Sequence, residues 1–573
     1  MAKHVRLWRG LAFGGALILA GCAAADSGAK DSVSVPAAAE SGSGGFGAYL
    51  AAHAARLRDD VGGASDHLSR TLESDPGNLE VLRLSLVYAT ADGRFDAAAS
   101  AARAIAAAKP GDIMAGYVLA AEAARGGDWA AADARLAAIP ENNLNALLGP
   151  LLKAWVAAGR GDAGGALARL APLAAKKAFL PVHDFHAALI CDLAGRDAQA
   201  EGFYEKTLAG EGGRSIHALQ AAGRFFNRTG KPARTAALLA AYAAEHGEAA
   251  LTEALRLRLV EKKAAERVAP NAAAGMGEAF FSVSSSLTNT DTWEVTLALG
   301  QLALRLDPGL DLARVLVGEL FEGHEDYARA NAAYAAIAAD SVVAYSVRLR
   351  IAKNLERMER RDEAARELTG LAAAFPARPE PLIELGDLYR GQSRYAEAVA
   401  AYDGAMTRIP KLDKRHWVLF YTRGISLERS NQWPRAEADF LAALKLEPEQ
   451  PLVLNYLGYS WLDKGMHLDE AQQMIEKAVA QRPRDGYIVD SLGWAHYQRG
   501  NYAAAVKHLE QAVVLVADDP TINDHLGDAY WRVGRRLEAR YQWQRALTLD
   551  PEDKQAEELR GKLANGLPPT LQP

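Results

Sequence analysis

The chain has 573 residues and a formal net charge of −6, from 65 Lys and Arg against 71 Asp and Glu. This length exceeds a single compact core, so we expect several domains or a repeat array. No basic excess is present, which argues against nucleic-acid binding. Half of the residues are hydrophobic and only 8% are aromatic, a composition that favours closely packed helices.

The N-terminus has the pattern of a secretory signal. Lys3, Arg6 and Arg9 precede an apolar stretch, residues 10–21, that ends at Cys22. About twelve helical residues rise roughly 18 Å, which is too short for a bilayer core of about 30 Å. A cysteine here could be a metal ligand, half of a disulfide or a site of covalent attachment, and the flanking residues favour attachment.

The segment Leu19, Ala20, Gly21, Cys22 resembles the lipobox of bacterial lipoproteins. The resemblance implies that residues 1–21 are a signal peptide and that Cys22 is the lipid attachment site, since several acyl chains give a lasting anchor. Ala23 resembles an outer-membrane address. The alternative is an ordinary secretory signal with a chance cysteine. Residues 22–46 are small and polar, and we interpret them as the anchor and a flexible tether.

A repeat begins at Gly47. Alanines recur at equal intervals, at Ala64, Ala98, Ala132, Ala166 and Ala200. Later in the chain Leu492 and Gly493 are followed at the same interval by Leu526 and Gly527. This interval, about 34 residues, is the spacing of the tetratricopeptide repeat, a helix, a turn and a second helix. The sequence therefore predicts an all-α superhelical solenoid of about fourteen helix-turn-helix units.

The repeat is interrupted near residues 248–275, where "VEKKAAERVAPNAAAG" ends in a proline and glycine loop. We therefore expect an N-terminal array over 47–268 and a C-terminal array over 269–551. Residues 552–573 are expected to form a polar capping helix and a tail, because a terminal repeat must shield its last apolar face.

No sequence motif indicates catalysis. The segment "GSGGFG" at Gly42, Gly44 and Gly47 matches a dinucleotide fingerprint but follows no predicted strand. His183 and His186 lie one helical turn apart and lack a third metal ligand. We therefore expect no enzyme activity, no cofactor and no metal. Cys191 is expected to be a reduced, buried thiol.

The first helix of each unit is expected to line the concave side of the solenoid. Val489, Leu492, Gly493 and His496 form the predicted inward stripe of one unit. An adjacent off-core stripe carries aromatic and acidic residues that suit binding of a peptide or protein. These candidates are Asn455, Tyr459, Asp490, Trp494, Tyr497, Asp524, Asp528, Trp531 and Arg532. The alternative, that the rings pack between neighbouring helices, stays open.

The mature chain resembles long bacterial tetratricopeptide lipoproteins of the outer membrane, most specifically in "LNYLGYSWLDKGMHLDEAQQMIEKAVAQRPRDGYIVDSLGWAHYQRGNYAAAVKHLEQA" and "GMGEAFFSVSSSL". That group includes the adaptor lipoprotein of carboxyl-terminal processing proteases. The resemblance implies a lipid-anchored, periplasm-facing scaffold that binds a protease or its substrates. A second interpretation is an assembly factor for an outer-membrane secretion or polysaccharide-export machine.

Overall fold

The computed structural model describes residues 45–141, 144–210, 215–246, 250–287 and 293–568. The helices up to the middle of the chain are α1 (Gly45–Arg56), α2 (Val61–Ser74), α3 (Leu79–Ala91), α4 (Phe95–Ala108), α5 (Ile113–Arg125), α6 (Trp129–Ala137), α7 (Asn145–Gly159), α8 (Ala163–Ala174), α9 (Leu180–Leu193), α10 (Asp197–Ala209), α11 (Ile216–Arg228), α12 (Pro232–His246), α13 (Ala250–Arg256), α14 (Ala272–Ser284), α15 (Trp293–Leu306), α16 (Asp311–Gly323), α17 (Tyr327–Ala335), α18 (Ala344–Arg357) and α19 (Arg361–Ala374). The later helices are α20 (Glu380–Gly391), α21 (Tyr395–Thr407), α22 (Trp417–Arg429), α23 (Trp433–Leu446), α24 (Pro451–Asp463), α25 (Leu468–Gln481), α26 (Gly486–Gln498), α27 (Tyr502–Leu515), α28 (Pro520–Arg532), α29 (Arg536–Thr548) and α30 (Asp553–Asn565).

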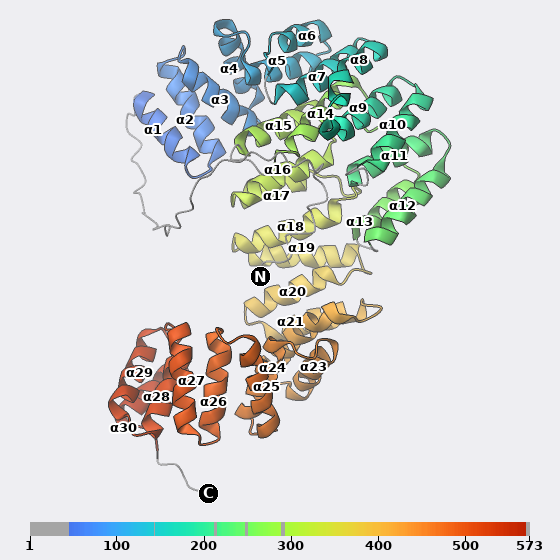
Figure 1. The fold of residues 1–573 in the computed structure, drawn as a ribbon. Helices are drawn as coiled ribbons and strands as arrows, with labels where there is room; N and C mark the ends of the chain where they lie inside the picture. Colours follow the sequence, from blue (N-terminus) through green and yellow to red (C-terminus); the bar gives the residue numbers. More distant parts are fainter. Residues whose placement is uncertain (1–44, 142–143, 211–214, 247–249, 288–292, 569–573) are drawn as a thin grey trace. The chain divides into compact units, whose positions relative to one another are not determined.

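The helices pair in chain order. Within the described residues, fourteen helical hairpins run from α1 and α2 to α28 and α29, with α13 between the sixth and seventh hairpins and α30 after the last (Figure 1). No strand occurs in the ranges given above. The predicted all-α solenoid of about fourteen units is therefore confirmed.

A small residue on the first helix allows the second helix of the same unit to approach closely. A Cβ atom added at Gly318, Gly386, Gly424 or Gly527 would lie 2.2–2.7 Å from an aromatic ring of the second helix, on Tyr334, Tyr402, Phe440 or Trp543 respectively. These rings are buried in the seams between the paired helices. Any side chain at the glycine would push the two helices apart, which explains why the repeat keeps glycine there.

The turn between paired helices also fixes the repeat. Gly93, Gly127, Gly161 and Gly195 all have φ between +70° and +79°, and they recur at the interval of the repeat. This left-handed conformation is accessible to glycine without strain. Several helices then begin at an aspartate whose carboxylate accepts a backbone N–H, as at Asp128 and Asp162.

The chain divides into two compact units between Glu367 and Leu368, within α19. The repeat is interrupted near the predicted place, by a π-helical turn at Leu257–Glu261 and an irregular stretch before α14. However, α14 then packs against α7, and α15 packs against α3 (Figure 1). Helices on both sides of the expected 268/269 boundary therefore share the first unit.

Helix α14 is apolar on nearly every side and is enclosed by its own unit. Its residues from Ala274 to Ser284 are all buried. Glu278 is fully buried too, and its Oε2 lies 2.7 Å from His217 Nε2 of α11. The contacts of α14 with α5, α7 and α9 cover one face of these three first helices. That face is therefore occupied by the chain itself.

Several predicted features lie outside the described residues. These are the signal peptide 1–21, Cys22, most of the tether 22–46 and the end of the tail. The first helix begins at Gly45, two residues before the expected start. Among the helices of the described ranges, none has the length and apolar character needed to cross a bilayer.

Cys191 lies on α9 and is a free, fully buried thiol, so its predicted burial is confirmed. Burial raises the pKa of the thiol, which keeps it protonated. The predicted capping helix is α30, in which Ala556 and Leu559 face the preceding repeat and the other residues are polar or at least partly exposed.

Candidate partner-binding groove

The second unit contains a groove across the faces of four first helices. Its volume is about 420 Å³, and α22, α24, α26 and α28 with the turns beside them supply its walls. The lining residues are Glu428, Arg429, Asn455, Tyr456, Tyr459, Ser460, Asp463, Lys464, Tyr487, Asp490, Ser491, Asp519, Thr521, Ile522 and His525. Successive first helices α24, α26 and α28 also pack against one another. A groove that crosses several first helices suits an extended ligand.

Three of the predicted partner-binding residues line this groove. Asn455 is partly buried, and its Oδ1 is buried without a hydrogen-bond partner. Such a buried acceptor is costly unless a donor reaches it. Tyr459 is partly buried, and burial together with Asp490 and Asp463 raises the pKa of its hydroxyl. Asp490 lies in the groove wall and is buried.

The predicted off-core placement of Asp490, Asp524 and Asp528 is wrong. All three are buried. The carboxylate of Asp490 lies 3.1 Å from His525 Nδ1, one repeat later. Lys562 of the capping helix contacts Asp524 at 2.7 Å and Asp528 at 2.9 Å. Each of these buried carboxylates therefore has a partner that can carry a positive charge, on the first helix of the following repeat or on the capping helix.

The predicted rings outside the groove contact neighbouring helices. Trp494 stacks on Tyr497 at 4.6 Å and on His525 at 3.9 Å between ring centroids. Trp531 lies 5.3 Å from Trp543, and Arg532 donates to the hydroxyl of Tyr497. Six of the predicted partner-binding residues do not line the groove: Trp494, Tyr497, Asp524, Asp528, Trp531 and Arg532. Their contacts stabilise the last repeats and the cap.

The inward stripe was predicted largely as observed. Val489, Leu492 and Gly493 are buried, whereas His496 is half-buried and stacks on His508.

Sequence reasoning missed several groove residues. Tyr487 is 57% exposed and is followed one repeat later by Thr521. A second repeat position also lines the groove. In three successive units it is occupied by Tyr456, Ser491 and His525, each of which follows directly after a residue of the predicted stripe that begins with Asn455. Alignment of the last repeats on their glycines would have shown this second row of positions.

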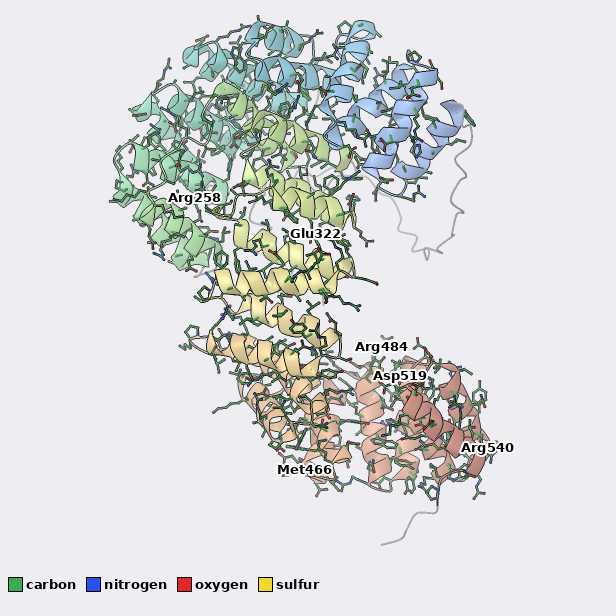
Figure 2. The ribbon with its side chains drawn as sticks, turned by 180° about the vertical axis from the view of Figure 1, so that it is seen from behind. Arg258, Glu322, Met466, Arg484, Asp519 and Arg540 are labelled. Atoms are coloured by element: carbon green, nitrogen blue, oxygen red, sulfur yellow. The ribbon has the colours of Figure 1, made fainter. Side chains whose placement is uncertain are left out.

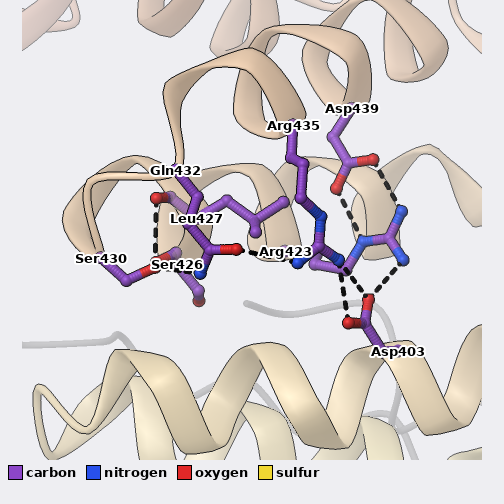
Figure 3. A network of polar contacts seen from close by, with 8 residues as sticks. All are labelled: Asp403, Arg423, Ser426, Leu427, Ser430, Gln432, Arg435 and Asp439. Carbon is purple, nitrogen blue, oxygen red and sulfur yellow. Dashed lines mark hydrogen bonds and ion pairs between the residues drawn. The ribbon is translucent and has the colours of Figure 1, made fainter.

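An ion-pair network joins α21, α22 and α23 (Figure 3). Arg423 of α22 binds Asp439 of α23 through two nitrogens, each at 2.7 Å, and Asp403 of α21 at 2.8 Å. Asp439 is buried, while Arg435 reaches Asp403 from the more exposed side. The network fixes the position of α22, which contributes Glu428 and Arg429 to the groove.

No group of three or more possible metal ligands occurs among the residues that the structure describes. His183 contacts the neighbouring Asp184 at 2.9 Å. His186 instead faces the interior, where Trp155 Nε1 donates to its Nδ1 at 3.0 Å. The two histidines therefore take part in different contacts.

Comparison with known proteins agrees with this geometry. Residues 493–534 match the family model described as TPR repeat, and residues 349–412 and 421–467 match the model described as Tetratricopeptide repeat. The fold is a tetratricopeptide-repeat solenoid. Repeats of this type form scaffolds that bind protein partners.

One curated relative is the TPR repeat-containing protein PA4667 of Pseudomonas aeruginosa, which is 30% identical over 223 residues. The match covers 38% of this chain and about a third of the relative, 36% of its length. A tetratricopeptide repeat protein from Parabacteroides merdae has a TM-score of 0.37 and 16% identity over 44% of this chain and 99% of its own. The Cut9-Hcn1 hetero-tetramer of APC/C contains a chain with a TM-score of 0.35 and 16% identity, covering 86% of this chain and 96% of that one.

Proposed function

We propose that the chain is a non-enzymatic scaffold that holds an extended segment of a protein partner in the groove of its second unit. The observation that carries this proposal is the groove itself, in which the unpartnered Oδ1 of Asn455 and the exposed ring of Tyr487 face one hollow. A carbonyl oxygen of this kind can accept a backbone N–H from an extended segment. An exposed ring adds apolar contact area for the same ligand.

The proposal extends to location and partner. Cys22 is the lipid attachment site, and the scaffold faces the periplasm from the outer membrane, where it presents substrates to a carboxyl-terminal processing protease. Its supports are the lipobox-like sequence before Cys22 and the resemblance of the repeats to adaptor lipoproteins.

Removal of two groove rings should weaken partner capture without unfolding the protein. We expect Tyr459→Ala combined with Tyr487→Ala to weaken binding about thirtyfold, because anchoring rings commonly contribute this much. Co-purification from detergent extracts followed by mass spectrometry measures the loss. Tyr541→Ala is the matched control, since this ring is 65% exposed on α29 and does not line the groove. Equal recovery of partners by the wild type and the double variant would refute the groove, and the absence of a processing protease among them would refute the adaptor role.

The anchor has its own test. Cys22→Ser should move the protein from the membrane fraction to the soluble fraction or leave its signal uncut, because no thiol remains to accept the lipid. Cell fractionation and mass spectrometry of the N-terminus report both outcomes. A variant that stays membrane-bound with its signal removed would exclude Cys22 as the anchor.

A further inference from the structure

We infer that the groove of the second unit selects a partner segment that carries lysine or arginine side chains, and that Asp463 and Asp519 receive these cations. The inference rests on the proposed function, because it assigns the chemistry of the ligand to the same groove. It follows from the charges that remain unpaired along the groove wall.

Asp463 is an unpaired carboxylate at an unfavourable place. It is the last residue of α24, and no hydrogen bond or ion pair joins its carboxylate to the described residues. A negative charge at a helix C-terminus opposes the helix dipole. Local features that disfavour the fold are expected at functional sites. A cation supplied by a ligand would give this carboxylate the partner that the described residues do not.

Asp519 forms the second acidic position. It caps α28, where its Oδ1 accepts the backbone N–H groups of Thr521 and Ile522. No cationic side chain of the described chain pairs with its carboxylate, and Figure 2 labels it on the second unit. Arg484 is exposed and does not line the groove. Asp519 thus keeps its charge available at the groove wall.

The cations of the groove contact residues of the chain itself. Lys464 Nζ lies 4.9 Å from the ring centroid of Trp433, which is not a groove residue. Arg429 lies 3.8 Å from its neighbour Glu428. His525 is held by Asp490. The lining holds four carboxylates against the two cations of Arg429 and Lys464, so its charge balance is negative.

Two tyrosines report the same negative field. The pKa of Tyr487 is raised by partial burial and then by Asp519, Asp518 and Asp485. The pKa of Tyr459 is raised by burial and then by Asp490 and Asp463. Rings in such a field also suit a basic side chain, since the face of an aromatic ring attracts a cation and the aliphatic stem packs against it.

A random 12-residue peptide library displayed on phage and selected on the immobilised full-length chain tests this inference. We expect the enriched peptides to contain more lysine and arginine than the unselected library. A synthetic enriched peptide should bind roughly tenfold more weakly to Asp463→Asn combined with Asp519→Asn, and more weakly to the wild type at high salt. Asparagine at 519 still caps α28, so this variant keeps the fold.

Glu557→Gln combined with Glu558→Gln is the matched control, because it removes two exposed carboxylates of α30 outside the groove. It should leave the affinity unchanged. Two results would overturn the inference and leave the groove proposal intact. One is a set of peptides that bind the wild type but lack basic residues. The other is equal binding of the enriched peptide to the aspartate and the glutamate double variants. Enrichment that is the same on Tyr459→Ala combined with Tyr487→Ala would overturn both.

Discussion

Replacement of Trp155 by alanine is expected to destabilise the first unit by about 3–5 kcal/mol. The indole is fully buried on α7 and lies against Gly275 of α14, where an added Cβ would come within 2.2 Å of the ring. The substitution removes a contact between α7 and α14 and opens a cavity that these helices can fill only in part. It also removes the hydrogen bond to His186.

The lost hydrogen bond belongs to a chain of three side chains. Burial lowers the pKa of His186 to about 3, so the imidazole is neutral at pH 7. Because Nδ1 accepts from Trp155, Nε2 carries the proton and donates to Ser282 Oγ at 3.2 Å. These contacts join α7, α9 and α14, so loss of the indole should loosen all three helices.

Hydrogen exchange measured by mass spectrometry resolves this effect by segment. Peptides from α7, α9 and α14 should lose protection in Trp155→Ala, whereas Phe46→Ala should change stability by less than about 0.5 kcal/mol. Phe46 is a suitable control because it is 76% exposed on α1. A change below about 1 kcal/mol in α7 and α14 would show that α14 does not depend on this contact.

Replacement of Arg423 by alanine is expected to destabilise the second unit by about 3–5 kcal/mol. The arginine side chain is 14% exposed and its partner Asp439 is 8% exposed, so the substitution leaves a buried carboxylate without its cation (Figure 3). Arg435→Ala should cost at most about 1 kcal/mol, because this side chain is 49% exposed.

Chemical denaturation with hydrogen exchange of the α22 and α23 peptides measures both losses. A double variant, Arg423→Met with Asp439→Leu, separates the charge effect from packing. It removes both charges together and should recover most of the stability, because a buried pair replaced by apolar residues is often neutral. If Arg423→Ala and Arg435→Ala had equal effects, burial of the pair would not determine its contribution.

The repeat period predicted most of the fold. Two residues specify the seam of a unit. One is a glycine on the first helix, as at Gly424 and Gly527, and the other is an aromatic residue at a fixed distance along the second helix. Both can be read from the sequence. The return of α14 to α7 is different. The run "GMGEAFFSVSSSL" is apolar on all sides, which indicates burial. Its partner Trp155 stands several repeats before Gly275, and no local pattern connects the two.

The candidate site was predicted only in part, for a similar reason. Asn455 and Tyr459 were found because helical periodicity places them beside the buried stripe. The burial of Asp524 and Asp528 depends on Lys562, which belongs to the cap and lies outside the repeat pattern. The His525 and Asp490 pair, in contrast, joins equivalent places in adjacent repeats, so a comparison of those repeats could have detected it.

Site-specific photo-crosslinking in cells tests the groove most directly. A p-benzoylphenylalanine residue replaces Tyr487 in one variant and Tyr541 in the other, since the two rings are 57% and 65% exposed and only Tyr487 lines the groove. Our account predicts crosslinks to a protein partner from position 487, a lower yield of them in the Asp463→Asn and Asp519→Asn background, and none from position 541. Crosslinks from position 541 alone, or equal crosslinking from both positions, would contradict it.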